Sequence, residues 1–315
     1  MSAAAPHRGT LLLTGGSGMV GSNIREHPRA AEWTILAPGS RELDLTDTAA
    51  TYDYIQRTQP DIIVHAAGKV GGIQMNMANP VDFLDVNAVI GRNVIMGARA
   101  AKIPQMINLA STCIYPRAAP NPLVEDAMLT GPLEPTNEGY SLAKIMALRL
   151  CQYIRAETPE LLYKTLIPCN LYGRHDTFDP AASHMVPAVI AKLHAAREAG
   201  IDTMDIWGDG TARREFMYAR DLAGAVLRAA ADMEALPDLM NIGVGHDHSV
   251  TDYYNAAAKV VGWQGSFEHD LSKPTGMKQK LCDTTRQTDW GWQPQTSLHD
   301  GMALTYQFFL ERQSA

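Results

Sequence analysis

Cysteine is scarce in this sequence, and the few cysteines lie far apart. Among 315 residues there are four, Cys113, Cys151, Cys169 and Cys282, and none has a Cys-x-x-Cys or Cys/His spacing. Structural zinc sites and disulfide frameworks both need closely patterned cysteines. We therefore expect reduced thiols and no metal site.

Positive charge and long apolar runs are also in short supply. The 27 Lys and Arg residues against 34 Asp and Glu give a net charge of −7, which argues against a nucleic-acid partner. No stretch reaches the ~18 uninterrupted apolar residues that a membrane span needs. The apolar run at residues 11–13 is too short for a signal peptide. These absences predict a cytoplasmic protein without a membrane partner.

Apolar side chains are abundant, and their spacing alternates between two periods. Hydrophobic residues make up 46% of the chain, enough for a large core. Short apolar runs typical of strands alternate with three- and four-residue spacings typical of helices, which indicates βαβ units and a parallel sheet. The predicted strands are residues 11–13, 33–37, 62–66, 106–109 and 162–167. The predicted helices are residues 20–26, 49–57, 83–101, 141–155, 188–199, 222–233, 250–261 and 298–309, with a turn-rich segment at 266–292.

A glycine-rich turn follows the first predicted strand and precedes a helix. Such a turn lets the backbone approach a pyrophosphate while the helix N-terminus faces the anion. A plain glycine turn is the alternative, but the flanking strand and helix favour a dinucleotide site. The residues assigned to it are Gly15, Gly16, Ser17, Gly18, Met19, Val20 and Gly21.

The glycine turn and the alternating elements together predict the fold class. We expect an α/β protein with a Rossmann doubly wound parallel sheet and a smaller C-terminal substrate-binding domain. Residues 1–170 would form the NADP-binding domain and residues 171–315 the substrate domain, with segments near 215–245 returning to the first. The boundary is set where the strand and helix alternation loosens.

The segment after the second predicted strand bears on the choice of nicotinamide cofactor. An acidic side chain there would hydrogen-bond a ribose 2′-hydroxyl and repel a 2′-phosphate. This chain instead has Ser40 and Arg41, and its first acid is Glu42. We therefore predict NADPH, with Leu45 near the adenine, although Arg41 as a solvated surface residue is an open alternative.

Tyr140 and Lys144 form a second chemical pattern, four residues apart on one face of a predicted helix. We expect the ammonium to lower the pKa of the phenol, so that Tyr140 can exchange a proton with a carbonyl oxygen. Ser111 follows the fourth predicted strand, at the edge where doubly wound sheets bind ligands, and can hydrogen-bond the same oxygen.

With these motifs in order, the chain resembles the extended short-chain dehydrogenase/reductase family. Further blocks resemble a branch of that family that acts on GDP-sugars: residues 69–73 (KVGGI), 111–116 (STCIYP), 134–138 (EPTNE), 170–173 (NLYG), 183–184 (SH) and 207–211 (WGDGT). The resemblance covers essentially the whole chain. It implies 3,5-epimerisation of GDP-4-keto-6-deoxy-D-mannose and NADPH-dependent reduction at C4 to GDP-L-fucose. It also implies a homodimer packed through the helices at 83–101 and 141–155.

The same resemblance assigns roles to individual residues. Cys113 would abstract a proton as thiolate and His184 would return one from the other face, although each residue taken alone is more often structural. The reverse assignment of base and acid stays open. Additional cofactor contacts would be Leu109, Pro168, Asn170, Leu171 and His184, and substrate contacts Lys192, Trp207, Arg214 and Lys280. Two departures from the family pattern are Thr275, where an acid is usual, and Arg174, where proline is usual.

Two other functions stay open at this point. One is a 4-reductase, with or without epimerase activity, for another GDP-4-keto sugar such as a 6-deoxy-heptose. The other is a non-catalytic cofactor-sensing protein on a dehydrogenase fold. Such proteins typically lose the Tyr/Lys pair, whereas this chain keeps Ser111, Tyr140 and Lys144.

Overall fold

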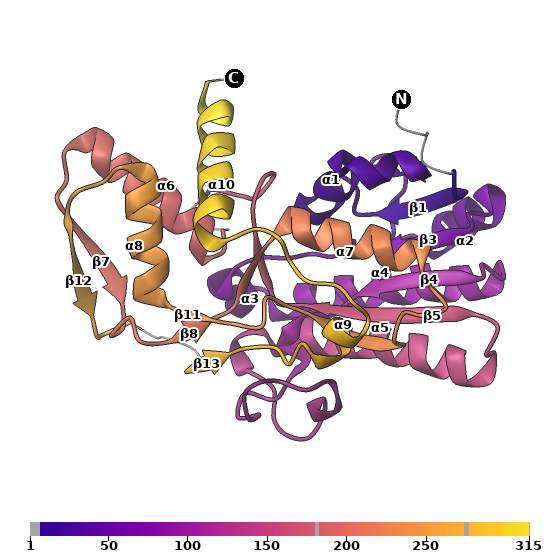
Figure 1. Cartoon of the computed structure of the whole chain (residues 1–315). Helices are drawn as coiled ribbons and strands as arrows, with labels where there is room; N and C mark the ends of the chain where they lie inside the picture. The colour runs from indigo at the N-terminus through magenta and orange to yellow at the C-terminus, as the bar shows by residue number, and fades with distance from the viewer. Residues whose placement is uncertain (1–6, 180–182, 274–276, 315) are drawn as a thin grey trace.

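A computed structural model of the chain describes residues 7–179, 183–273 and 277–314. Its centre is a six-stranded sheet, on the right of Figure 1, in which every neighbouring pair runs parallel. The strand order is β10-β5-β4-β3-β1-β2. The chain therefore passes from β1 to β2 on one side, and then crosses over to place β3 on the other side of β1. The strands are β1 (Thr10–Thr14), β2 (Thr34–Leu36), β3 (Ile62–His65), β4 (Gln105–Leu109), β5 (Leu162–Pro168) and β10 (Leu239–Ile242). The predicted doubly wound α/β fold is confirmed.

Helices cover both faces of this sheet, which explains why its inner strands are buried at nearly every position. On one face, α1 (Met19–Glu26) packs beside α7 (Ala219–Ala231) in a cluster that includes Leu11, Val64 and Leu166. The other face carries α2 (Thr48–Thr58), α4 (Pro80–Ala100) and α5 (Glu138–Glu157). β5 is buried at all seven positions.

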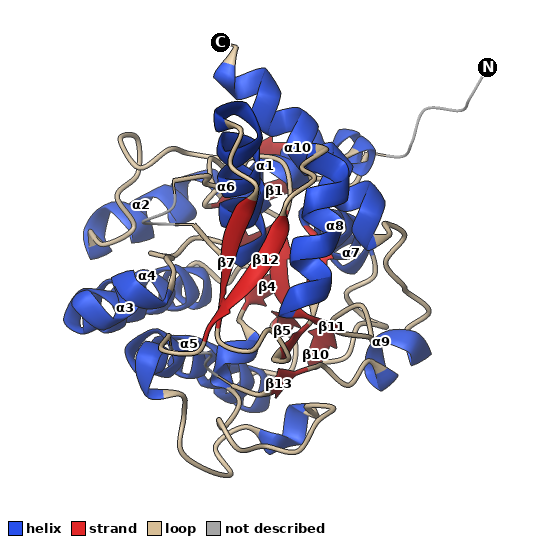
Figure 2. Ribbon diagram, turned by 90° about the vertical axis from the view of Figure 1, so that its left-hand side faces the viewer, coloured by secondary structure: helices blue, strands red, loops and turns tan. Residues whose placement is uncertain are grey.

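A second, separate core lies beyond the carboxyl ends of the strands. Three helices, α6 (Met185–Ala199), α8 (Val250–Val261) and α10 (Leu298–Gln313), surround an apolar cluster with a parallel pair of strands. That pair is β7 (Thr203–Trp207) and β12 (Ser266–Asp270), seen face on in Figure 2. Within the described residues, no helix combines the length and apolarity needed to cross a membrane.

Several shorter elements complete the fold. They are α3 (Ile73–Ala78), α9 (Thr285–Asp289), and the strands β6 (Asn170–Tyr172), β8 (Arg213–Arg214), β9 (Phe216–Tyr218), β11 (His248–Ser249) and β13 (Gln279–Lys280). β8 is flanked by β11 and β13 in a three-stranded sheet. The segment expected to be only turn-rich, 266–292, therefore holds β12, β13 and α9. The expected division at residue 170 stays a prediction, although α7 and β10 from the later half do lie on the central sheet.

The carboxylate of the buried Glu215 connects the segment that follows β10 with the segment that follows β13. It accepts hydrogen bonds from the backbone N–H groups of Val244 (2.6 Å), Gly245 (2.9 Å) and Cys282 (2.8 Å). Burial raises the pKa of Glu215, while the backbone donors act in the opposite direction. The residue fixes the end of β10 relative to the segment after β13.

Arg174 forms a second link, between α1 and α10. Its guanidinium contacts Glu26 (3.7 Å) and Glu311 (3.4 Å) and lies 4.8 Å from the centroid of the Phe308 ring. His175 contacts the same Glu26 at 2.7 Å. The departure from proline at position 174 thus places a cation between a helix of the sheet and the C-terminal helix.

Candidate active site

A cavity of about 1210 Å³ opens where the carboxyl ends of the sheet strands face the second core. Ligands of doubly wound sheets bind at this edge. Nearly all of the predicted site residues line the cavity. They are Gly15, Ser17, Gly18, Met19, Val20, Gly21, Ser40, Leu45, Leu109, Ser111, Cys113, Tyr140, Lys144, Pro168, Asn170, Leu171, His184, Lys192, Trp207, Arg214 and Lys280.

Two predicted cofactor residues, Gly16 and Arg41, are not among the described residues that line it. A Cβ on Gly16 would lie 2.7 Å from the Cβ of Ala37, so this glycine serves the packing of the turn against the segment after β2. Arg41 is exposed to solvent. The structure therefore does not bring Arg41 to the cavity, and its contact with a 2′-phosphate stays a prediction.

The geometry of the glycine turn fits a dinucleotide. Gly15 has a φ of 73°, a conformation that favours glycine. A Cβ on Gly21 would lie 2.2 Å from the carbonyl oxygen of Gly15, so helix α1 packs against the turn with no room for a side chain. α1 starts after Gly18 with no side-chain cap, which leaves backbone N–H groups at its first turn for a phosphate.

Tyr140, Lys144 and Ser111 meet at the ends of β4 and α5. The ammonium of Lys144 donates a hydrogen bond to the carbonyl oxygen of Leu109 (2.9 Å) and lies 5.7 Å from the centroid of the Tyr140 ring. Ser111 accepts a hydrogen bond from the backbone N–H of Cys113 (3.3 Å). The phenol, the ammonium and the hydroxyl all line the cavity at this edge of the sheet.

The expectation that Lys144 lowers the pKa of Tyr140 is wrong. Burial raises the pKa of Tyr140, and the electrostatic effect of the nearby Cys113 side chain acts in the same direction. Burial also lowers the pKa of Lys144 from 10.5 to about 8. Desolvation therefore outweighs the attraction between the pair. At neutral pH Tyr140 holds its proton and can donate a hydrogen bond.

Cys113 lies in a single 3₁₀ turn, Thr112–Ile114, directly after Ser111. Its Sγ accepts hydrogen bonds from the amide of Asn137 (3.2 Å) and the ammonium of Lys280 (3.5 Å). His184 precedes α6 and is accessible from the cavity, but the surrounding protein desolvates it. That desolvation lowers the pKa of His184, and the charge of Lys280 lowers it further.

The far end of the cavity carries basic and aromatic side chains. The ammonium groups of Lys192 and Lys273 each lie 5.8 Å from the centroid of the Trp207 ring, which is 40% exposed. Arg214 lies on β8, directly beside Lys280 on β13. Burial lowers the pKa of Arg214. Cations and an open aromatic face can together hold a nucleoside diphosphate.

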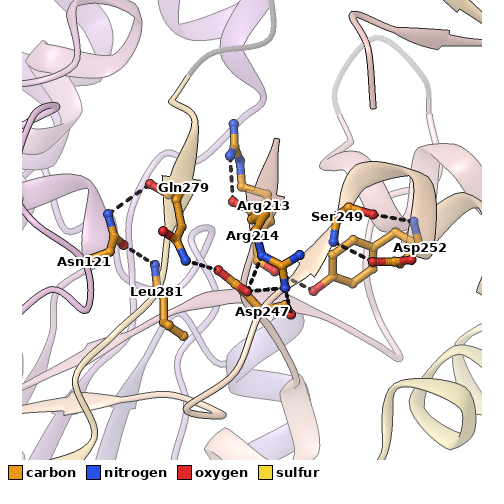
Figure 3. Close-up of polar contacts among 9 residues, drawn as sticks. Asn121, Arg213, Arg214, Asp247, Ser249, Asp252, Gln279 and Leu281 are labelled. Atoms are coloured by element: carbon orange, nitrogen blue, oxygen red, sulfur yellow. Dashed lines mark hydrogen bonds and ion pairs between the residues drawn. The ribbon is translucent and has the colours of Figure 1, made fainter. Parts of the chain in front are cut away.

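Figure 3 shows polar contacts around Arg214 and on either side of position 280. Arg213 forms an ion pair with Asp247 (2.6 Å) and does not line the cavity among the described residues. Asn121 bonds the backbone on either side of Lys280. The sequence reasoning missed Asn137, Lys273 and Asn121, although Asn137 lies in the quoted block at 134–138. The departure at Thr275 lies outside the described residues.

Comparison with known proteins gives concordant results. Residues 11–243 match the sequence profile described as the NAD dependent epimerase/dehydratase family. A GDP-L-fucose synthase of Azorhizobium caulinodans is 49% identical over 95% of this chain and 96% of that protein. A GDP-L-colitose synthase of Yersinia pseudotuberculosis is 46% identical over 96% of this chain and 99% of that protein. The solved structure of MlghC, a GDP-mannoheptose C4 reductase from Campylobacter jejuni with NADP bound, superimposes with a TM-score of 0.87. It is 25% identical to this chain, and the match covers 97% of this chain and 99% of that one.

Proposed function

The chain belongs to the NAD dependent epimerase/dehydratase family, and on this basis we propose that it catalyses the reaction of a GDP-L-fucose synthase. It would epimerise C3 and C5 of GDP-4-keto-6-deoxy-D-mannose and then reduce C4 with NADPH to give GDP-L-fucose. The observation that carries the proposal is the convergence of Cys113, His184, Tyr140 and Ser111 on one cavity beside a dinucleotide turn.

The epimerase half needs proton transfer at carbons next to a ketone. The C4 ketone acidifies the protons on C3 and C5, and removal of either proton gives an enolate. Cys113 and His184 are the groups that would remove and return these protons, and Tyr140 would donate a hydrogen bond to the enolate oxygen. Its raised pKa suits that task, because the phenol stays protonated at neutral pH.

The reductase half uses the same phenol. The nicotinamide, when bound, supplies a hydride to C4. Tyr140 then gives its proton to the oxygen that becomes a hydroxyl, while Ser111 keeps that oxygen in place. The ammonium of Lys144, which donates a hydrogen bond to Leu109, lies 5.7 Å from the centroid of the Tyr140 ring, where its charge would offset part of the negative charge left on the phenolate.

We propose NADPH over NADH because Ser40 and Arg41 stand where an acid would select the 2′-hydroxyl. MlghC, which has a similar structure, is described with NADP bound. We further propose a homodimer through α4 and α5, since both helices expose large apolar side chains, Val81, Leu84, Leu142 and Tyr153. The proposed location is the cytoplasm, where NADPH and GDP-sugars are made and where the four free cysteines would stay reduced.

A related reaction is the second candidate. The similarity to a GDP-L-colitose synthase and to a GDP-mannoheptose C4 reductase favours a 4-reductase for another GDP-4-keto sugar. The contacts of Cys113 with Asn137 and Lys280 support the epimerase reading, because a plain reductase has no use for a thiol held by a cation.

The test supplies the purified protein with GDP-4-keto-6-deoxy-D-mannose and NADPH in D₂O and reads the product by NMR. We expect GDP-L-fucose with deuterium at C3 and C5. Cys113→Ser should abolish the exchange and still bind NADPH, whereas Cys151→Ser, which changes a buried cysteine of α5, should retain it. NADPH consumption without exchange would indicate a plain 4-reductase, and no consumption would refute the substrate class.

A further inference from the structure

The side chain of Cys113 is held by two donors from different parts of the chain. Asn137 comes from the turn before α5, 24 positions after Cys113, and Lys280 comes from β13, 167 positions after Cys113. A neutral thiol is a weak acceptor, whereas a thiolate accepts strongly from an amide and a cation. Both donors therefore stabilise the charged form of the sulfur.

We infer that Lys280 is a positioning residue for Cys113, holding its sulfur as thiolate together with Asn137, rather than only a contact for the substrate diphosphate. The inference rests on the proposed function in one respect, that Cys113 moves protons during epimerisation. The inference assigns to Lys280 the task of setting the protonation state of Cys113.

Hydrogen bonds fix the backbone on either side of Lys280, whose ammonium contacts the sulfur of Cys113. The side-chain oxygen of Asn121 accepts from the N–H of Leu281 (2.8 Å), and its amide donates to the carbonyl of Gln279 (3.5 Å). Figure 3 shows Asn121 bonded on both sides of position 280. The amide of Gln279 in turn donates to Asp247 (2.6 Å). β13 is thus held by Asn121, from the loop after β4, and by Asp247, from the loop between β10 and β11.

Other charged or titratable groups line the same cavity as Cys113. On the neighbouring elements they are Tyr140 of α5, His184 before α6, Arg214 of β8, Lys280 of β13 and Glu134 of the loop before α5. Lys280 and Arg214 are adjacent cations on paired strands. The charge of Glu134 favours the charged form of Arg214, against the effect of burial. The charge of Lys280 also disfavours protonation of His184. One cation therefore favours a charged sulfur and a neutral imidazole together, which suits removal of a proton by Cys113.

The experiment measures the rate at which iodoacetamide alkylates Cys113 as a function of pH, without substrate or nucleotide. Cys151, Cys169 and Cys282 are buried, so the modified peptide can be assigned by mass spectrometry. We expect Lys280→Met to slow alkylation at about pH 7 by roughly tenfold or more, and to leave the rate near about pH 10 unchanged. Equal rates at high pH show that access to the thiol is intact.

Two further variants separate charge at this position from charge nearby. Lys280→Arg should keep a profile close to that of the wild type. Lys278→Met removes an exposed lysine two positions away and should not alter the profile. If Lys280→Met does not fold, Asn121→Ala takes its place, because releasing β13 should slow alkylation by a smaller factor.

A wild-type profile in Lys280→Met, or in Asn121→Ala if that variant is used, overturns the inference. A raised KM for the GDP-sugar beside an unchanged profile would assign Lys280 to the diphosphate alone. Failure of the proposed function would look different. The wild type would then not exchange deuterium into the GDP-sugar, while the alkylation profile of Lys280→Met would still shift.

Discussion

Lys144 carries an electrostatic cost that can be measured through the pH dependence of stability. Burial lowers its pKa from 10.5 to about 8 in the folded protein. Between these two values the unfolded chain binds more protons than the folded one, so this residue makes stability rise with pH. The unfavourable contribution is fully present below about pH 8. It amounts to about 3 kcal/mol at pH 7, from about 1.4 kcal/mol per pKa unit.

The perturbation is Lys144→Met, which removes the titrating group. The hydrogen bond to Leu109 is lost as well, but that loss does not depend on pH. Urea unfolding of the wild type and the variant at about pH 7 and about pH 9.5 gives the difference in unfolding free energy at each pH. We expect the wild type to gain about 2 kcal/mol relative to the variant between these values.

The matched control is Lys259→Met, which removes an exposed lysine near the end of α8. Its difference from the wild type should be flat over the same range. A difference for Lys144→Met that is also flat would refute the reasoning, because it would mean that the buried ammonium is as well solvated in the folded protein as in the unfolded chain.

Three further predictions concern the cofactor turn, the cofactor preference and the buried carboxylate. Gly21→Ala should cost about 1–3 kcal/mol of stability and weaken nucleotide binding in a fluorescence titration, because its Cβ has no room beside Gly15. Arg41→Ala should reduce the kcat/KM preference for NADPH over NADH by about tenfold, and an unchanged ratio would leave Arg41 a surface residue. Glu215→Gln should destabilise by about 2–3 kcal/mol in thermal or urea unfolding, since one amide hydrogen must face a backbone N–H, whereas the exposed Glu234→Gln should have little effect.

Much of the sheet and its helices could be predicted because their residues repeat with a clear period. The five predicted strands and eight predicted helices all correspond to elements of the fold, with ends shifted by a few residues. β7 and β12 were missed because each has five residues, most of them exposed; the alternation in β7 is short, and β12 shows none. Their pairing joins segments far apart in the sequence, and only the packing of the second core makes it favourable.

The site divides in the same way. The glycine turn is a local motif, and so is the pair of Tyr140 and Lys144. Both can therefore be recognised from the spacing of residues along the sequence. The donors to Cys113 come from 24 and 167 positions away, and no local pattern connects them to the sulfur. The pKa of Tyr140 was predicted in the wrong direction because charge proximity can be inferred from spacing in a helix, whereas the degree of burial cannot.

The position of β10 at one edge of the central sheet has a consequence for how the chain is made. β5 needs β10 to cover its outer edge, yet β10 is translated only after β6, α6, β7, β8, β9 and α7. Until then a strand that is buried at every position of the folded protein has an open row of backbone donors and acceptors on the nascent chain, a state prone to pairing with other chains. A fragment that stops at the end of β5 should therefore aggregate when expressed alone, and the intact protein should depend on chaperones during synthesis.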